Sequence, residues 1–217
     1  MPVSQFGEPR GPGGWLAAQV VARLTGDANR WMLDCLEVGR VDRVLDVGCG
    51  PGLAVAYAAE LTAGPVVGVD ASDTMVRHAL RRNRASVRQG RVEIVRADAA
   101  RLPFPDGHFT KAGSLNSLQF WADPDRGLRE LFRVLEPGGR VAVVLMARND
   151  DPPGPEPPPW VDRTVSGMRV AGFHDPVVVA RTFGGVLHRA LVGTRPGKES
   201  GAPLDPTADG VRRGADH

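Results

Sequence analysis

Lysine is almost absent from this sequence of 217 residues, in which Lys111 and Lys198 are the only two examples. The basic side chains are therefore nearly all arginine, and the formal net charge is only +2. So small an excess of positive charge provides no strong attraction to nucleic acid or to an anionic membrane surface. We expect neither a nucleic acid nor a membrane among the partners of this chain.

Cysteine is also scarce, and Cys35 and Cys49 are too few for a disulfide framework or a zinc site. We therefore expect no bound metal. No apolar run approaches the ~20 residues that a membrane-spanning helix needs. The first residues also lack the basic stretch, apolar core and cleavage site of a secretory signal, so we expect a cytoplasmic protein.

Segments of strand and helix character alternate along most of the chain, whose length suits one α/β domain with a short appendage. Because each parallel pair of strands needs a crossover, this alternation predicts a mostly parallel, twisted sheet with helices on both faces. Two further strands, Pro176–Phe183 and Leu187–Gly193, are joined by Gly184-Gly185 and predict a C-terminal antiparallel hairpin. The strands expected before them are residues 43–47, 65–70, 92–96, 111–118 and 140–146.

Three parts of the chain are expected from composition. Residues 1–38 begin with a glycine- and proline-rich arm, continue with helices over 15–24 and from about Asp27, and are expected to lie over the binding site. Residues 39–195 form the main domain, which includes a stiff proline-rich connector at 150–159. Residues 196–217 are polar and are expected to be a disordered tail.

A glycine loop, Asp46-Val47-Gly48-Cys49-Gly50-Pro51-Gly52, follows the first predicted strand. Glycines allow a tight turn and a close approach of the backbone to a ligand, and the next helix begins where a carboxylate or phosphate is favoured. The spacing Gly-x-Gly-x-Gly differs from the dinucleotide pattern Gly-x-Gly-x-x-Gly, and the Lys-Ser/Thr pair of a P-loop is absent. The loop predicts a nucleoside-bearing ligand, with a glycine-rich turn that binds nothing as the alternative.

Two aspartates follow neighbouring strands. Asp70 ends the second predicted strand, from which a carboxylate can accept both hydrogen bonds of a ribose diol. Ser72 or Asp73 can cap the next helix, so Asp70 is not required for capping. Asp98 follows the third strand and can either accept a hydrogen bond from the amine of adenine or form a turn. Spacing alone leaves both roles of Asp98 open.

Four stretches in register resemble the class I S-adenosylmethionine-dependent methyltransferases, in particular their small-molecule branch. They are residues 44–52, 67–72, 97–104 and 133–139, the last being Arg133-Val134-Leu135-Glu136-Pro137-Gly138-Gly139. Residues 5–11 and 116–121 are similar to one bacterial subgroup of that family. The resemblance implies a Rossmann-like fold, S-adenosylmethionine as the cofactor, and in-line transfer of its methyl group to a small-molecule acceptor.

The same resemblance implies where the cofactor binds. The loop residues Asp46, Gly48, Gly50 and Gly52 would surround its methionine part, and Asp70 would bind the ribose hydroxyls. The remaining implied residues are Ala71 packed on adenine, Asp98 and the Ala99 amide at the adenine edge, and Asn116 facing the methionine end or the substrate. For Asn116 an ordinary polar residue at a strand end is an equal alternative.

The sequence also departs from the family. The stretch Leu115-Asn116-Ser117-Leu118 replaces the Asn/Asp-Pro-Pro-Tyr/Phe signature of amide methyltransferases, which argues against methylation of bases or glutamine. No inserted lid helices follow the fifth strand, and we identify no catalytic base. Two rival functions follow: a module that binds the cofactor without transferring its methyl group, and a nicotinamide-dependent oxidoreductase, which the glycine spacing disfavours. A monomer and a homodimer both remain open.

Overall fold

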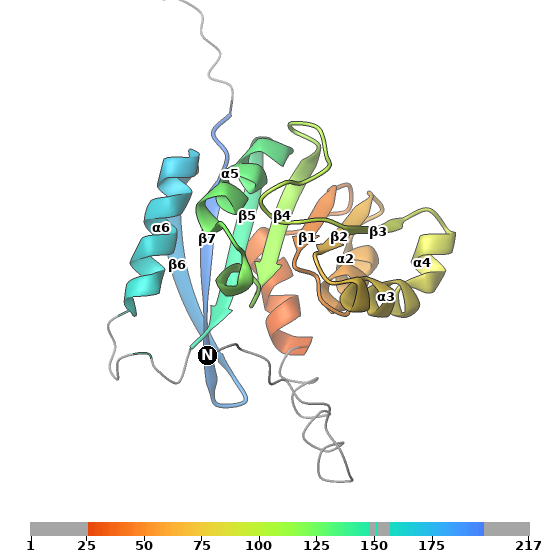
Figure 1. Ribbon diagram of the computed structural model, residues 1–217, viewed down its shortest axis with the longest axis horizontal. Coiled ribbons are helices and arrows are strands. Elements are labelled where there is room, and N and C mark those ends of the chain that lie inside the picture. Colours follow the sequence, from red (N-terminus) through yellow and green to blue (C-terminus); the bar gives the residue numbers. More distant parts are fainter. Residues whose placement is uncertain (1–25, 148–150, 152–156, 198–217) are drawn as a thin grey trace, which may run out of the picture.

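The computed structural model describes residues 26–147, 151 and 157–197, which form a seven-stranded sheet with the order β3-β2-β1-β4-β5-β7-β6 (Figure 1). The first five strands pair in parallel, whereas β7 is antiparallel to both β5 and β6. The mostly parallel sheet and the antiparallel C-terminal hairpin are therefore confirmed. The strands are β1 (Val44–Val47), β2 (Val66–Asp70), β3 (Val92–Arg96), β4 (Phe109–Leu115), β5 (Leu135–Met146), β6 (His174–Phe183) and β7 (Val186–Thr194).

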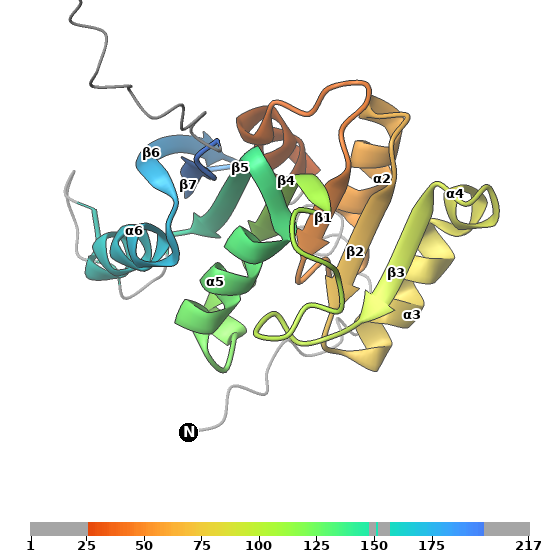
Figure 2. The ribbon, with the colours of Figure 1, turned by 90° about the horizontal axis from the view of Figure 1, so that it is seen from above.

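Helices cover both faces of the sheet, as the alternation predicts (Figure 2). The helix over residues 26–36 packs with α2 and α3 on one face, and α5 and α6 pack on the other. The named helices are α2 (Leu53–Leu61), α3 (Asp73–Arg82), α4 (Arg84–Arg88), α5 (Pro124–Val134) and α6 (Pro159–Ala171), with a short 3-10 helix η1 (Leu118–Phe120).

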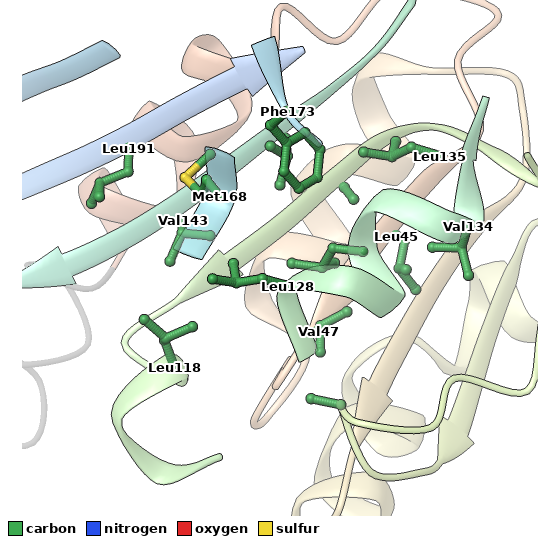
Figure 3. Close-up of a cluster of buried hydrophobic side chains, with 14 of the residues drawn as sticks. Leu45, Val47, Leu118, Leu128, Val134, Leu135, Val143, Met168, Phe173 and Leu191 are labelled. Atoms are coloured by element: carbon green, nitrogen blue, oxygen red, sulfur yellow. The ribbon is translucent and has the colours of Figure 1, made fainter. Parts of the chain in front are cut away.

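Two apolar cores lie on opposite faces of the sheet. In the first, Leu128 of α5 and Met168 of α6 pack with Leu45, Val143 and Leu191 of the strands (Figure 3). The second joins the helix over 26–36, α2 and the other sides of the same strands. Burial of both faces explains why the central strands consist almost wholly of apolar residues.

Local signals in the sequence set the starts of two helices. Ser72 caps α3, because its Oγ accepts a hydrogen bond from the Met75 amide at 3.4 Å. Asp123 caps α5 through a hydrogen bond of 2.9 Å from the Arg126 amide to its Oδ1, and Pro124 follows at the first helical position. These caps place the two helices directly after the loops that meet at the carboxyl ends of the strands.

The predicted bounds of two strands are wrong. β4 ends at Leu115 instead of residue 118, because Asn116 has a left-handed φ of 51° and the chain then turns into η1. β5 begins at Leu135 instead of residue 140, because Gly138 and Gly139 continue the pairing with the end of β7. The Gly138 amide donates to the Arg195 carbonyl, and the Arg195 amide donates to the Gly139 carbonyl, both at 2.8 Å.

The glycines Gly184 and Gly185 join β6 to β7 with φ values of 54° and 81°, as the sequence predicts for the hairpin turn. The arm and helix expected within residues 1–25, most of the connector and the tail beyond residue 197 lie outside the described residues. Within the part of the chain that is described, no helix is long and apolar enough to cross a membrane.

Candidate functional site

A cavity of about 400 Å³ opens at the carboxyl ends of β1 to β4. Parallel sheets bind ligands at this edge, because the loops that follow neighbouring strands meet there. Seven of the nine predicted cofactor-binding residues line this cavity, and they are Gly48, Gly50, Asp70, Ala71, Asp98, Ala99 and Asn116. The other two, Asp46 and Gly52, do not.

The glycine loop forms one wall of the cavity with a backbone that favours glycine. Gly48 and Gly50 have φ values of 74° and 51°. A Cβ atom on Gly48 would overlap the side chain of Ser117, so the glycine loop and the loop after β4 are in contact at the cavity. A Cβ atom on Gly50 would meet nothing within 4 Å, so this part of the backbone faces open space that a ligand can occupy.

Asp70 is held in a fixed orientation by two backbone amides. The Gly50 amide donates to its Oδ2 at 2.9 Å, and the Ser72 amide donates to its Oδ1 at 2.8 Å. Each carboxylate oxygen keeps further lone pairs for another donor. The carboxylate therefore links the glycine loop to the end of β2 and presents a double acceptor at the cavity.

Ala71, which follows β2, and Asp98 and Ala99, which follow β3, form another wall of the cavity. Asp98 is exposed, and its Oδ1 accepts a hydrogen bond of 2.8 Å from the Ala100 amide. This is the turn that the sequence left open as one role of Asp98. Because Asp98 also lines the cavity, the turn holds its carboxylate at the site and does not oppose a second role there.

Asn116 connects the ends of two strands at the other side of the cavity. Its side-chain Oδ1 accepts a hydrogen bond of 2.8 Å from the Met146 backbone amide. The backbone amide of Asn116 donates to the Val144 carbonyl at 2.7 Å. The side-chain oxygen thus serves the sheet. Only the side-chain NH₂ group is left to donate to a ligand.

Gly52 is explained by helix packing instead of by the cavity. Its φ is 77°, and a Cβ atom there would lie 2.6 Å from Nδ2 of Asn83 and 2.9 Å from the Cβ of Ala79. The Asn83 side chain also donates to the Gly52 carbonyl at 2.9 Å. A glycine at this position lets α3 pack closely on the start of α2.

The Asp46 side chain lies on the face of the sheet that the helix over 26–36 covers. It lies beside Gly68 of β2 and Gly113 of β4 and is buried. Burial raises the pKa of the Asp46 carboxyl to about 7, and the negative charge of Asp70 adds to this increase. Burial likewise raises the pKa of the Cys49 thiol, together with the charges of Asp46 and Asp70, so Cys49 stays a neutral thiol.

The sequence did not assign the wall formed by η1. Ser117, Phe120 and Trp121 line the cavity beyond Asn116. Trp121 is fixed, because its Nε1 donates to the Ser117 Oγ at 2.8 Å and its ring packs on Gly127. Phe120 is 65% exposed at the rim. The aromatic pair within residues 116–121 was the available signal.

The chemistry of the cavity differs between its two sides. The side formed by β2 and β3 carries the carboxylates of Asp70 and Asp98, whereas the side formed by η1 carries two aromatic rings. Such a site suits a cationic or hydroxyl-rich ligand next to an apolar one. Among the described residues that line the cavity, Asp70 and Asp98 are the only ionisable side chains.

Residues 45–143 match a family described as "Methyltransferase domain". The chain is 26% identical over 161 residues to an uncharacterized methyltransferase, YdaC, of Bacillus subtilis, which covers 74% of this chain and 87% of that protein. It is 38% identical over 122 residues to a ubiquinone/menaquinone biosynthesis C-methyltransferase, UbiE, of Serratia proteamaculans. That match covers 55% of this chain and only 49% of the relative.

Two solved structures share the fold. The [4+2]-cyclase SpnF superimposes with a TM-score of 0.67 at 22% identity and covers 79% of this chain and 82% of its own. A SAM dependent methyltransferase from Aquifex aeolicus superimposes with a TM-score of 0.64 at 21% identity and covers 77% of this chain and 89% of its own. At these identities the structural likeness establishes the fold alone.

Proposed function

Because residues 45–143 match a methyltransferase domain, we propose that this chain is a class I S-adenosylmethionine-dependent methyltransferase and that it transfers the methyl group of this cofactor to a small-molecule acceptor. When bound, the cofactor supplies a methyl group on a positively charged sulfur, already activated for displacement. The protein must then hold acceptor and donor in line and exclude water. The full activity and the acceptor are proposals, since the chain spans about half the length of UbiE.

The orientation of Asp70 is the observation that carries this proposal. Two backbone amides aim its carboxylate at the cavity, where it can accept hydrogen bonds from both hydroxyls of a ribose. The open space at Gly50 lies beside it, where the start of α2 favours a carboxylate such as that of methionine. We assign Asp98, Ala99 and Ala71 to the adenine and Gly48 and Asn116 to the methionine end.

We place the acceptor against Phe120 and Trp121, on the side of the cavity away from Asp98. Two rings at this wall favour an apolar or aromatic molecule. A base is needed only if the acceptor starts protonated, and no ionisable side chain lines this wall among the described residues. The proposed acceptor is therefore one whose nucleophilic atom does not depend on the protein for deprotonation.

The proposed domain division follows from the same assignment. Residues 39–195 form the cofactor-binding domain, and residues 1–38 act together with it at the site. We keep the cytoplasmic location expected from the sequence. The helix over 26–36 supports a tight association, because Met32 and Leu36 pack against Gly113 of β4.

Calorimetry with S-adenosylhomocysteine on the wild type and on Asp70→Ala tests this proposal. We expect the variant to bind about ten- to a hundred-fold more weakly, since the loss of hydrogen bonds to a charged acceptor should cost about 1.5–3 kcal/mol in total. Asp73→Ala is the matched control, because that exposed carboxylate pairs with Arg96 at 3.1 Å and does not line the cavity. Equal affinity of wild type and Asp70→Ala would refute the ribose assignment.

Two further measurements separate the rival functions. A thermal-shift comparison of NAD with S-adenosylhomocysteine should show stabilisation by the second compound only. Methyl transfer from labelled cofactor to a panel of apolar and aromatic acceptors then distinguishes an enzyme from a module that only binds. A module that binds the cofactor without methyl transfer is worth testing, because the cyclase SpnF shares this fold and has a different activity.

A further inference from the structure

β6 forms an edge of the sheet that is open on both faces. It is the last strand in the sheet order, and β7 is its only pairing partner within residues 26–147 and 157–197. Successive side chains of a strand point to opposite faces, yet every residue from Val177 to Thr182 is exposed. Val177, Val178 and Val179 are 53%, 41% and 41% exposed. An exposed apolar edge of this kind is a template for pairing with another strand.

The neighbouring helix α6 also carries an exposed apolar residue. Figure 1 shows α6 and β6 together at one flank of the molecule. Val170, in the last turn of α6, is 79% exposed. β6 itself carries no lysine, the residue that most often protects sheet edges. Its proline, Pro176, is buried at a bulge between His174 and Val177, so the regular edge begins at Val177.

The sequence of β6 is complementary to itself in an antiparallel arrangement. With a twofold axis through Val178, each Val178 faces its counterpart and Val177 faces Val179 of the second copy. Asp175 lies within the bulge at the start of β6 and Arg181 lies near the end of the strand, so the antiparallel arrangement brings Asp175 to the same end as Arg181 of the second copy, twice in the dimer. The Asp175 side chain is 92% exposed, and Arg181 is exposed beside the ring of Phe183. Apolar residues thus meet apolar residues, and opposite charges meet at both ends.

We propose that two copies of this chain associate through their β6 strands, so that the sheet continues from one copy into the other. The edge hydrogen bonds, the three valines and the paired charges supply the contacts. The cavity lies at the ends of β1 to β4, and β5 and β7 separate it from β6, so both sites stay open in the dimer. This proposal is independent of the proposed function.

Sedimentation measurements over a range of concentrations test the dimer. The wild type should approach twice the 23.1 kDa of one chain, with Val178→Lys shifted towards the monomer by about tenfold or more in dissociation constant. Val41→Lys is the control, because Val41 is 85% exposed and lies before β1, away from β6. Calorimetry with S-adenosylhomocysteine should give the same affinity for all three proteins, which shows that the variants fold.

A charge exchange tests the antiparallel arrangement of the two strands. Asp175→Arg and Arg181→Asp should each weaken the dimer, since each places like charges at both ends of the pairing. An equimolar mixture of these two variants should restore it, because both contacts in the mixed dimer then join opposite charges. A wild type that stays monomeric at every concentration, or a dimer that Val178→Lys leaves unchanged, overturns the proposal. A mixture that fails to restore association overturns the antiparallel arrangement.

Discussion

The buried carboxyl of Asp46 predicts that the free protein loses stability as the pH rises from about 4 to about 7. Burial, and to a lesser degree the charge of Asp70, raises its pKa from 3.8 to about 7. The folded chain therefore keeps a proton that the unfolded chain has already released. Because the folded state binds more protons in this window, the free energy of unfolding falls with increasing pH, and the loss is complete above the folded pKa.

The size of this effect follows from the pKa difference. A difference of about three pKa units corresponds to about 4 kcal/mol, at about 1.36 kcal/mol per pKa unit. This value is the upper limit for the loss in free energy of unfolding above about pH 7. Between about pH 5 and about pH 8 the same relation gives about 3 kcal/mol. Rearrangement around the charged carboxylate reduces this, so we expect about 1–3 kcal/mol.

Urea unfolding of the wild type and Asp46→Asn at these two pH values measures the effect. The stability of Asp46→Asn relative to the wild type should rise by about 1–3 kcal/mol from about pH 5 to about pH 8, since the amide cannot ionise. Any constant cost of burying the amide cancels in this difference. Glu60→Gln, which removes an exposed carboxylate from α2, is the control. A relative stability that is independent of pH, or that falls, would falsify the assignment of Asp46 as a buried, protonated group.

Two further predictions concern the elements that hold the site. Gly127→Ala should destabilise the protein by about 1–3 kcal/mol and change the tryptophan fluorescence, because the new Cβ atom would overlap the ring of Trp121. Gly39→Ala, whose Cβ would lie 3.4 Å from Asp42 Oδ2, is the control, and equal effects of the two changes would contradict this account. Arg195→Ala should cost about 1–2 kcal/mol in urea unfolding, because Arg195 Nη1 donates to the carbonyls of Phe132, Arg133 and Leu135 at the end of α5. The exposed Arg84→Ala should have little effect, and a similar loss in both variants would mean that the carbonyl contacts of Arg195 contribute nothing.

Features set by neighbouring residues could be predicted from the sequence. The order of strands and helices follows from local apolar patterns, and β3 begins and ends at the residues predicted for it. The position of Asp70 at a strand end follows in the same way, since the carboxyl ends of parallel strands share one edge. The bounds of β4 and β5 were wrong, because the left-handed Asn116 and the pairing of Gly138 and Gly139 with β7 depend on contacts with distant segments.

Within the candidate site, the direction of each side chain was the part that the sequence left open. Asp46 and Gly48 are two residues apart in one loop, yet Gly48 faces the cavity and Asp46 is buried in the sheet. Gly52 and Gly48 are both glycines of the same Gly-x-Gly-x-Gly loop, but α3 occupies the space beside Gly52. These differences arise because Asp46 lies within β1, on a face that helices cover, whereas Gly48 follows the strand in a left-handed turn. The segments that pack beside each position then decide whether it is open or filled.

The sequence by itself determined the order of the elements, the glycine loop and the place of the Asp70 carboxylate at a strand end. Each of these features rests on residues close together in the chain. Only the tertiary structure decided that η1 forms the second wall of the cavity and that β6 is open on both faces. Both depend on which segments meet in space. Neither Phe120 nor Val178 differs in local pattern from a buried apolar residue, so their exposure is a property of the assembled fold.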